Sequence, residues 1–214
     1  MSDSKIDLKK KRIRSFFLSL QPYSEIKKEL AEKVEIEGLT YIQMRLDVNK
    51  ITPVFVQKIK EKVEKKILNA KIRKASEDDL EIVMNIHNRA WMTANEPFRP
   101  IDFISLKKIF EYPKTAILIA NVYGTDGGFI ILDSEGDNNE IGIIAGLGVL
   151  PRFQRKGLGT ILSVAAWNYF QKNKVLHLKC EVYKDNKASL EFIQSLEFEQ
   201  YELKTYTKND FILE

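Results

Sequence analysis

The sequence contains little of what a metal centre, a disulfide framework or a membrane span would need. Its 214 residues include one cysteine, Cys180, and two histidines, so an internal disulfide is excluded and a Cys/His metal site is not expected. No apolar run approaches the roughly 18 residues of a membrane-spanning helix. The basic run before residues 13–20 resembles a signal peptide only briefly, because Arg14 interrupts the apolar part and no small-residue cleavage site follows. We therefore expect a cytoplasmic protein with no metal and no membrane association.

Charge is distributed unevenly along the chain. The net charge is +4, but residues 1–70 hold 16 Lys and Arg against 10 Asp and Glu, whereas residues 71–214 hold 18 against 20. A basic first third could contact an acidic partner. Its lysines also fit the solvated faces of helices, and no aromatic residues are interleaved among them to stack on bases. Nucleic acid is therefore an unfavoured partner.

The first 69 residues predict a small α+β or helical N-terminal module. Residues 13–34 are expected to form a strand or short helix followed by a helix, and residues 39–48 alternate as a strand does. Thr52 and Pro53 supply an N-cap and a first-turn proline for a further helix. Its apolar stripe consists of Phe55, Ile59, Val63 and Ile67. Something must cover this stripe, so the module could serve as a dimerisation arm, and none of its residues carries recognisable chemistry.

Residues 70–214 predict an α+β domain with a mixed sheet and helices on its faces. Ser76 followed by Asp79 is a capping signature for the first helix, and Gly124–Gly128 indicates a hairpin. The expected strands are 71–75, 116–122, 129–132, 141–149, 175–182, 198–207 and 211–213, and the expected helices are 80–91, 101–110, 158–170 and 187–196.

Residues 147–160 are the most informative stretch. A strand leads into them, a helix leads out, and three cations and the glycines Gly157 and Gly159 lie between. The first turn of a helix has unpaired N–H groups and partial positive charge, and glycine lets a phosphate approach the backbone. The stretch therefore predicts a site for a phosphate-bearing ligand.

Three glycines of the strand before this stretch, Gly142, Gly146 and Gly148, fall on alternate positions. Alternate residues of a strand share one face, and glycine inside a strand often marks a close ligand or a bulge. We expect one bare face along which a ligand lies; a twisted strand without a ligand is the alternative.

The order of elements, with Gln154-Arg-Lys-Gly-Leu-Gly159 between strand and helix, resembles the GNAT superfamily of acetyl-CoA-dependent N-acetyltransferases. The resemblance covers about residues 71–210. Further matching segments are Val149-Leu-Pro151, the start at Lys71 to Leu80, the hairpin ending Gly128-Phe-Ile130, the block from Val182 through Asn186 to Leu190, and Leu196-x-Phe198. The resemblance implies an acyl-CoA N-acyltransferase-like fold with a mixed, mostly antiparallel sheet and flanking helices.

By this resemblance the ligand is acetyl-CoA, acting as co-substrate. Backbone amides of residues 154–160 would hold the pyrophosphate, the strand at 147–149 would pair with the pantetheine arm, and one of its N–H groups would polarise the thioester carbonyl. The implied cofactor-binding residues are Leu147, Gly148, Val149, Gln154, Arg155, Lys156, Gly157, Leu158, Gly159, Thr160, Asn186 and Ser189.

Two positions depart from the family's pattern. Many members have a tyrosine seven residues after the asparagine that Asn186 matches, and this tyrosine serves as general acid for the departing thiolate. Here Ile193 occupies that position. Glu197 replaces a turn glycine. Tyr183, Ser189 or water could supply the proton. A dedicated acid could also be dispensable, because the conjugate thiol has a pKa of about 8.5 and its thiolate is therefore a stable leaving group.

No side chain is assigned a catalytic role. Glu140 precedes Leu147 by seven residues, more than about 20 Å along a strand, which is too far for direct proton transfer. His87 is interpreted as a surface or capping residue, and His177 and Cys180 as structural. The candidates for lining the acceptor pocket, or for ordinary core packing, are Trp91, Met92, Phe98 and Phe103.

Two functions of different classes stay open. The leading one is an enzyme that transfers acetyl to a primary amine by direct attack in a ternary complex; the amine could belong to a small molecule, an amino acid, an aminoglycoside-like molecule or a protein. The slightly acidic residues 71–214 favour a cationic acceptor. The other is an acyl-CoA-binding module without turnover, whose N-terminal module contacts protein or nucleic acid.

Overall fold

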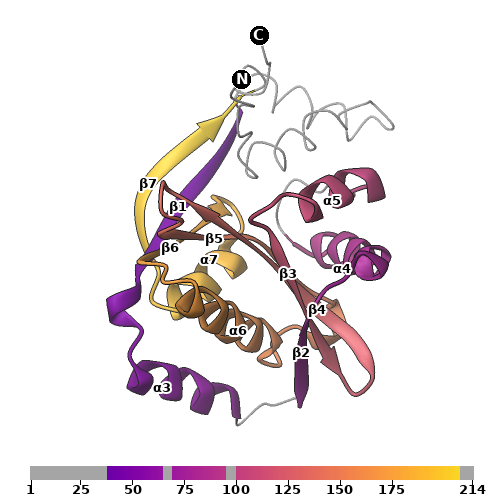
Figure 1. Ribbon diagram of the computed structural model, residues 1–214, viewed down its shortest axis with the longest axis horizontal. Coiled ribbons are helices and arrows are strands. Elements are labelled where there is room, and N and C mark those ends of the chain that lie inside the picture. The colour runs from indigo at the N-terminus through magenta and orange to yellow at the C-terminus, as the bar shows by residue number, and fades with distance from the viewer. Residues whose placement is uncertain (1–37, 65–68, 95–99, 208–214) are drawn as a thin grey trace.

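The computed structural model describes residues 38–64, 69–94 and 100–207. They form a seven-stranded sheet in the order β2-β3-β4-β5-β6-β1-β7 (Figure 1). The strands are β1 (Leu39–Asp47), β2 (Ala70–Lys74), β3 (Ala116–Val122), β4 (Thr125–Glu135), β5 (Ile141–Val149), β6 (His177–Tyr183) and β7 (Glu199–Tyr206). The helices are α3 (Pro53–Glu64), α4 (Leu80–Trp91), α5 (Phe103–Phe110), α6 (Leu158–Lys172) and α7 (Lys187–Ser195), with short 3-10 turns η1 (Val48–Lys50), η2 (Glu77–Asp79) and η3 (Pro151–Phe153).

Neighbouring strands are antiparallel except for β5 and β6, which run parallel. The single parallel pair is a consequence of the crossover through α6, since parallel neighbours need a connection that returns across the sheet. The predicted mixed, mostly antiparallel sheet with flanking helices is confirmed.

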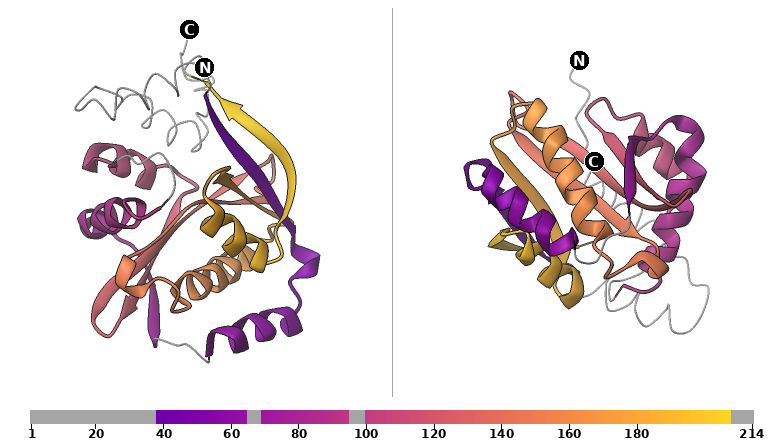
Figure 2. Two further views of the ribbon diagram at one scale, coloured as in Figure 1. Left: turned by 180° about the vertical axis from the view of Figure 1, so that it is seen from behind. Right: turned by 90° about the horizontal axis from the view of Figure 1, so that it is seen from below.

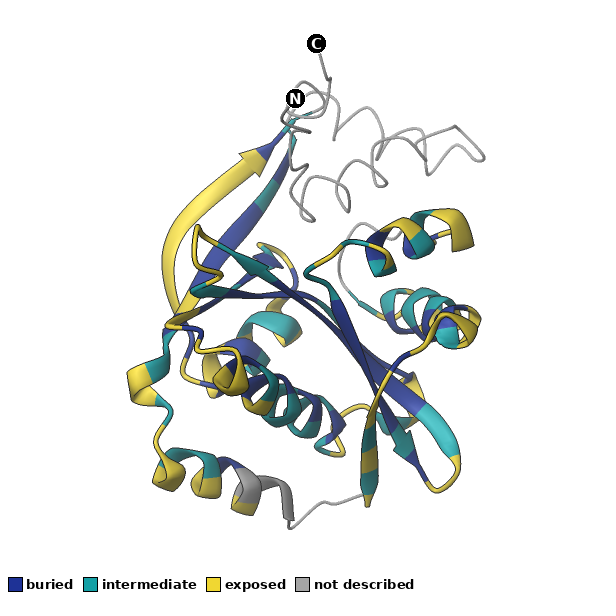
Figure 3. Cartoon of the chain, in the orientation of Figure 1, coloured by how far each residue is buried: buried dark blue, intermediate teal, exposed yellow. Residues whose placement is uncertain are grey.

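Helices cover both faces of the sheet (Figure 2). On one face, α4 and α5 pack through Leu80, Val83, Ile86, Leu106 and Ile109. On the other face lie α3, α6 and α7, and α6 buries residues from Leu158 to Phe170. The central strands are therefore buried on both sides, whereas the edge strand β7 is exposed along most of its length (Figure 3). None of the described helices combines the length and apolar character of a membrane span.

Strand β1 lies between β6 and β7 and pairs antiparallel with both. The predicted boundary between residues 69 and 70 thus falls between two strands of one sheet, β1 and β2. Alternation at residues 39–48 indicated a strand, but its partners come from the far end of the chain, and no local pattern identifies such partners.

Part of the apolar stripe of helix α3 is covered by the rest of the same chain. Phe55, Val56 and Ile59 pack against the core that contains α6, so this part of the stripe needs no second molecule. The side chains of Val63 and Ile67 lie outside the described residues, as do the elements predicted at 13–34 and 211–213.

The hairpin is tighter than its glycine pattern predicts. Tyr123 and Gly124 have φ of 50° and 79°, as in the two-residue turns that match the twist of antiparallel strands. Thr125 already pairs with Val122, so β4 starts at Thr125 and not at Phe129. The glycines at 127 and 128 belong to the strand.

Candidate active site

The site begins where β5 and β6 separate. Their pairing covers Ile141–Ile144 of β5 against 177–180 of β6, whereas β5 continues to Val149 along β4. Beyond Ile144, no strand of the described chain pairs with the β6-facing edge of β5. Backbone N–H and C=O groups on such an edge need partners, so a ligand with strand-like amides can add here.

A β-bulge in β5 accompanies this separation. Ile131 of β4 pairs with Gly146, and the next residue, Leu132, pairs with Ile144, which leaves Ala145 as the extra residue. A bulge interrupts the alternation of side chains and bends the strand.

The bulge overturns the predicted bare face. A Cβ on Gly142 would meet Phe170 of α6 at 2.8 Å, whereas a Cβ on Gly148 would meet Phe129 at 2.5 Å and Trp91 of α4 at 3.2 Å. Gly142 and Gly148 therefore lie on opposite faces, and the prediction that they share one is wrong. Both positions need glycine because protein side chains already fill the space.

The turn between β5 and α6 is solvent-exposed at residues 154–156. Arg155 and Gly157 have φ of 57° and 86°, and α6 begins at Leu158. Left-handed residues in such a turn can direct successive N–H groups into one anion-binding concavity, to which the first turn of α6 adds its dipole. A non-glycine residue in this region is uncommon, and strain of this kind clusters at functional sites.

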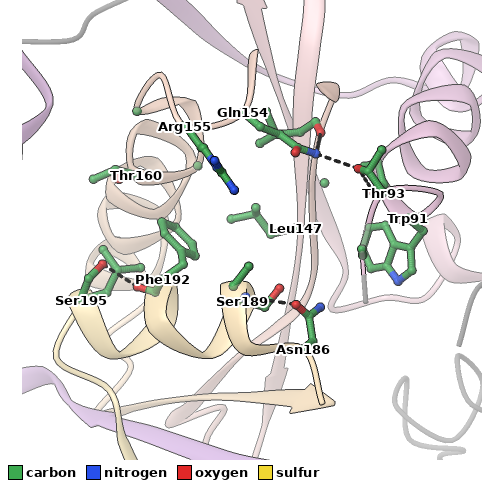
Figure 4. Close-up of a pocket in the computed structure, with 18 of the residues that line it drawn as sticks. Trp91, Thr93, Leu147, Gln154, Arg155, Thr160, Asn186, Ser189, Phe192 and Ser195 are labelled. Carbon is green, nitrogen blue, oxygen red and sulfur yellow. Dashed lines mark hydrogen bonds between the residues drawn. The ribbon is translucent and has the colours of Figure 1, made fainter. Parts of the chain in front are cut away.

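A pocket of about 510 Å³ joins this turn to β5, α4 and α7 (Figure 4). Ten of the twelve predicted cofactor-binding residues line it: Leu147, Gly148, Val149, Gln154, Arg155, Gly157, Gly159, Thr160, Asn186 and Ser189. Lys156 is exposed and does not line the pocket. Leu158 is 1% exposed and packs in the core, because it occupies the inward side of the first helical turn.

Asn186 and Gln154 have structural contacts that the motif did not reveal. Asn186 is buried and its Oδ1 accepts the N–H of Ser189 at 3.1 Å, which caps α7. Gln154 donates from Nε2 to the Val149 carbonyl at 3.0 Å and to Oγ1 of Thr93 at 3.3 Å. Gln154 thus links the anion-binding turn to the end of α4 (Figure 4).

The far end of the pocket is formed by Trp91, Thr93 and Ala94, at the end of α4. The Trp91 ring stacks on His87 with centroids 4.1 Å apart and an interplanar angle of 19°. His87 is half-buried and lines a small cavity beside Gly146, so its interpretation as a surface or capping histidine is wrong. The i,i+4 spacing of His87 and Trp91 was the available signal.

Two of the other candidates for the acceptor pocket, Met92 and Phe103, do not line it. Met92 is 70% exposed and Phe103 is 38% exposed, and Phe98 lies outside the described residues. The lining residues that sequence reasoning missed are Ile59, Ala90, Thr93, Ala94, Ala188, Phe192, Ser195 and Leu196. Those from α7 follow helical spacing from Ser189, which could have identified them; Ile59 had no such signal.

The residues weighed for catalysis lie mostly away from the pocket. Glu140 accepts the N–H of Asn138 with its carboxylate at 2.9 Å, at the opposite end of β5 from Leu147. His177 is exposed at the start of β6. Cys180 is 4% exposed in the core, as expected. Within the described residues, no three His, Cys, Asp or Glu side chains gather as metal ligands would.

The two departures from the family's pattern have different structural meanings. Ile193 is 8% exposed and packs in the core, so this chain places no hydroxyl there. Glu197 has φ of 64° at the end of α7, a conformation in which glycine is favoured. The glycine of the family is explained by this left-handed turn.

Comparison with known proteins agrees with this geometry. A family model described as the Acetyltransferase (GNAT) family matches residues 80–198. No curated protein sequence matches the chain. The aminoglycoside N-acetyltransferase AAC(6')-Iy, solved with CoA, superimposes with a TM-score of 0.54 at 19% identity over 66% of this chain and 96% of that one.

Two other solved structures show the same fold. The PaiA N-acetyltransferase from Thermoplasma acidophilum, in complex with coenzyme A, has a TM-score of 0.54 at 18% identity, over 65% of this chain and 100% of that one. A ribosomal-protein alanine N-acetyltransferase from Escherichia coli has a TM-score of 0.53 at 21% identity, over 62% and 79%. The predicted acyl-CoA N-acyltransferase-like fold is confirmed, and because the family match spans more than half of the chain, the protein belongs to the GNAT family of acetyltransferases.

Proposed function

We propose that the protein transfers acetyl from acetyl-CoA to a primary amine by direct attack in a ternary complex. One observation carries the proposal: a single pocket connects the anion-binding turn before α6, the open edge of β5 and the aromatic end of α4. Both substrates of such a reaction have a place within it, and neither has to leave before the other binds.

The donor end suits acetyl-CoA. The pyrophosphate would lie on the turn that contains Arg155 and Gly157, with the Arg155 charge beside it. The pantetheine amides would pair with the backbone of Leu147 and Val149 along the open edge of β5. An N–H of this edge would stabilise the negative charge that grows on the thioester oxygen as the amine attacks.

The acetyl group would then lie between β5 and the wall formed by Trp91. The amine nitrogen forms a C–N bond to the thioester carbon, the C–S bond breaks, and CoA leaves as its thiolate. The acceptor arrives as an ammonium with a pKa of about 10, so it loses one proton to bulk water before it attacks, and the nitrogen loses a second proton to water as the amide forms. The departing thiolate, whose conjugate thiol has a pKa of about 8.5, takes one proton from water, either directly or relayed through the hydroxyl of Ser189, which lines the pocket.

The acceptor class is open between small amines and proteins. The solved relatives include enzymes named for aminoglycosides and for a ribosomal-protein alanine, and AAC(6')-Iy has also been solved with a bisubstrate analogue that joins CoA to acetylneamine. An aromatic wall at Trp91 suits a cationic amine through cation–π attraction, in keeping with the slightly acidic residues 71–214.

Two measurements test the proposal. Calorimetry with acetyl-CoA should show binding, and a free-thiol assay with acetyl-CoA and a panel of polyamines, aminoglycosides, amino acids and peptides should show thiol release with at least one amine. A folded protein that binds no acetyl-CoA at millimolar concentration would overturn the proposal.

One observation favours the second candidate, an acyl-CoA-binding module without turnover. Ile193 occupies the position where many family members have their general acid, and it is buried in the core. Tight CoA binding without thiol release across the whole amine panel would favour this candidate. A partner-binding or dimerising role for residues 1–69, and a cytoplasmic location, stay predictions.

A further inference from the structure

Helix α3 lies outside the residues that the family model matches, yet it borders the pocket. It packs along α6, on the face of the sheet that also carries α7 (Figures 1 and 2). Ile59, in the middle of α3, is 6% exposed. It is the one residue before position 80 among the described pocket-lining residues.

Ile59 lines two cavities, as does Leu196 after α7. The larger is the 510 Å³ pocket, which Ile59 lines together with Ser195 and Leu196 of the α7 end. The smaller is an apolar cavity of about 40 Å³, which Phe55 and Val56 line as well. Val56 lines only the small cavity, so two residues about one helical turn apart differ in whether they reach the pocket.

The pocket has a direction. Figure 4 places Trp91 at one end and Thr160 and Ser195 at the other, with Leu147 and Arg155 between them. If the pantetheine arm follows Leu147 towards Trp91 and the pyrophosphate lies at Arg155, the remaining part of CoA, its adenosine, must extend to the opposite end. Ile59 belongs to that end, because it lines a second cavity together with Leu196, which directly follows Ser195.

The chemistry of this end fits a nucleoside. Phe192 of α7 lies against the first turn of α6, where a Cβ on Gly159 would come within 3.2 Å of its ring. Ile59 and Leu196, each 6% exposed, add small apolar surfaces to the lining of the same pocket. A purine ring stacks well on an aromatic side chain and tolerates aliphatic neighbours. The exposed Ser195 keeps the outer rim polar, as the ribose requires.

We propose that α3 is part of the cofactor site, with Ile59 forming a wall of the subsite for the adenosine of CoA. The inference rests on the proposed function, because it places adenosine by placing acetyl-CoA. It gives the N-terminal region a task that neither the family motif nor the sequence assigned to it: the chain outside the matched residues completes the binding site for one half of the donor.

The experiment compares two ligands on three proteins. The ligands are CoA and 4′-phosphopantetheine, which lacks the adenosine half, and the proteins are the full wild-type chain, Ile59→Ala and the matched control Val56→Ala. Both variants shorten the buried stripe of α3, but only Ile59 reaches the pocket. Ile59→Val serves as a milder second variant should Ile59→Ala unfold.

Calorimetry should show that Ile59→Ala weakens CoA binding about 3- to 5-fold. Only 6% of the residue is exposed, so the direct contact with the ligand is small, and most of the loss comes from the gap that the truncation opens in the wall. The affinity for 4′-phosphopantetheine should stay within about twofold in every protein, and Val56→Ala should bind both ligands as wild type does. Ile59→Val should move the ratio of the two affinities in the same direction by a smaller amount.

Two results would overturn the inference. One is an Ile59→Ala variant that binds CoA as tightly as wild type; the other is an equal loss for both ligands, which would mean that α3 acts through the fold and not on adenosine. A wild-type chain that binds neither ligand would overturn the proposed function together with this inference, whereas the first two results leave the proposed function standing.

Discussion

The two ends of the pocket differ in the kind of chemical group that they present to a ligand. At the donor end the groups offered to the pyrophosphate and to the pantetheine arm are backbone groups: the turn with left-handed Arg155 and Gly157, the first turn of α6 and the open edge of β5. At the acceptor end the wall consists of side chains, with Trp91 stacked on His87 and Thr93 bonded to Gln154.

This difference determines what each end can tolerate. A backbone site depends on conformation, so it is sensitive to the few residues whose φ cannot be changed and indifferent to most other side chains. A side-chain site depends on the identity of each residue and can differ between related proteins without any change of fold. Substitutions should therefore separate the two ends cleanly.

The largest effect is expected from Gly157→Val. Gly157 has φ of 86°, where a β-branched residue is strongly strained, so the turn should rearrange and its N–H groups should no longer converge. We expect the affinity for acetyl-CoA to fall about 100-fold or more, equivalent to at least ~2.7 kcal/mol. Isothermal calorimetry measures it directly.

Gly124→Val is the matched control for this variant. Gly124 has φ of 79°, and a Cβ placed on it meets no atom within 4 Å, so the backbone strain is similar while the hairpin lies away from the pocket. The free energy of unfolding of the Gly124→Val variant should fall by about 1–3 kcal/mol, without a change in its affinity for acetyl-CoA. Equal losses of affinity in the two variants would show that general destabilisation, and not the turn, is responsible.

Trp91→Ala should damage the other end. Removing the ring takes away the wall beside Gly148 and leaves His87 without its stacking partner at 4.1 Å. A misplaced acceptor can cost about 100-fold in rate, so we expect kcat/KM for the acceptor amine to fall about 10- to 100-fold. The KM for acetyl-CoA should change less than about twofold.

Steady-state kinetics with each substrate varied in turn separates these effects. Met92→Ala is the control, because Met92 follows Trp91 directly but is 70% exposed and does not line the pocket. If Trp91→Ala raised the KM for acetyl-CoA as much as the KM for the amine, the division between a backbone donor end and a side-chain acceptor end would be wrong.

The same division explains how much the sequence could predict. The donor end was accessible because conformation is encoded by residues with unusual backbone preferences, such as Gly157, and by a helix start after a strand. At the acceptor end only Trp91 was named correctly as a pocket candidate, and without a choice between pocket and core, because tryptophan and histidine on an amphipathic helix fit a core as well as a site. The bulge at Ala145 was invisible too, since an extra residue in one strand is defined only by its partner strand.

The strand order shows a second limit of prediction from the sequence. Most elements of residues 70–207 were predicted within a few residues, because hydrophobic periodicity is local. The insertion of β1 between β6 and β7 depends on pairings between the two ends of the described chain. Nothing in the alternation of residues 39–48 specifies which strands will accept it.

A smaller effect is expected at the helix that carries the acceptor wall. The start of α4 is held by Arg73, which donates to both carboxylate oxygens of Asp79 at 2.7 and 2.8 Å and to Asp126 at 2.9 Å. Asp79 also accepts the N–H of Ser76. The hydrogen bond from Arg73 is the main cause that lowers the pKa of Asp79 to about 2.

Asp79→Asn should lower the free energy of unfolding at pH 7 by about 1–2 kcal/mol, a value reduced for the solvent exposure of Arg73. Because the folded pKa lies below the unfolded value of about 3.9, the stabilisation is present above about pH 4 and is lost as the pH falls towards 2. Urea unfolding from pH 2 to 7 should therefore show a steep acid loss for wild type and a flatter one for the variant. A variant as stable as wild type at pH 7 would contradict this.

The smallest expected effect is on the free energy of unfolding at Glu197. It tests whether backbone conformation, and not side-chain identity, decides which residue is favoured at the border of the donor end. Glu197, with φ of 64°, ends α7, which carries the pocket residues Ser189 and Phe192. Glycine pays no steric cost in this conformation, so Glu197→Gly should raise the free energy of unfolding by about 0.5–1 kcal/mol and leave acetyl-CoA affinity within about twofold.

Glu191→Gly is the matched control, because Glu191 is exposed in the interior of the same helix. There the same replacement should lower the free energy of unfolding by about 1 kcal/mol, since glycine is a poor helix former. Urea midpoints measured side by side should move in opposite directions for one and the same chemical change. If both midpoints fell, the side chain of Glu197 would contribute more to stability than its backbone conformation costs.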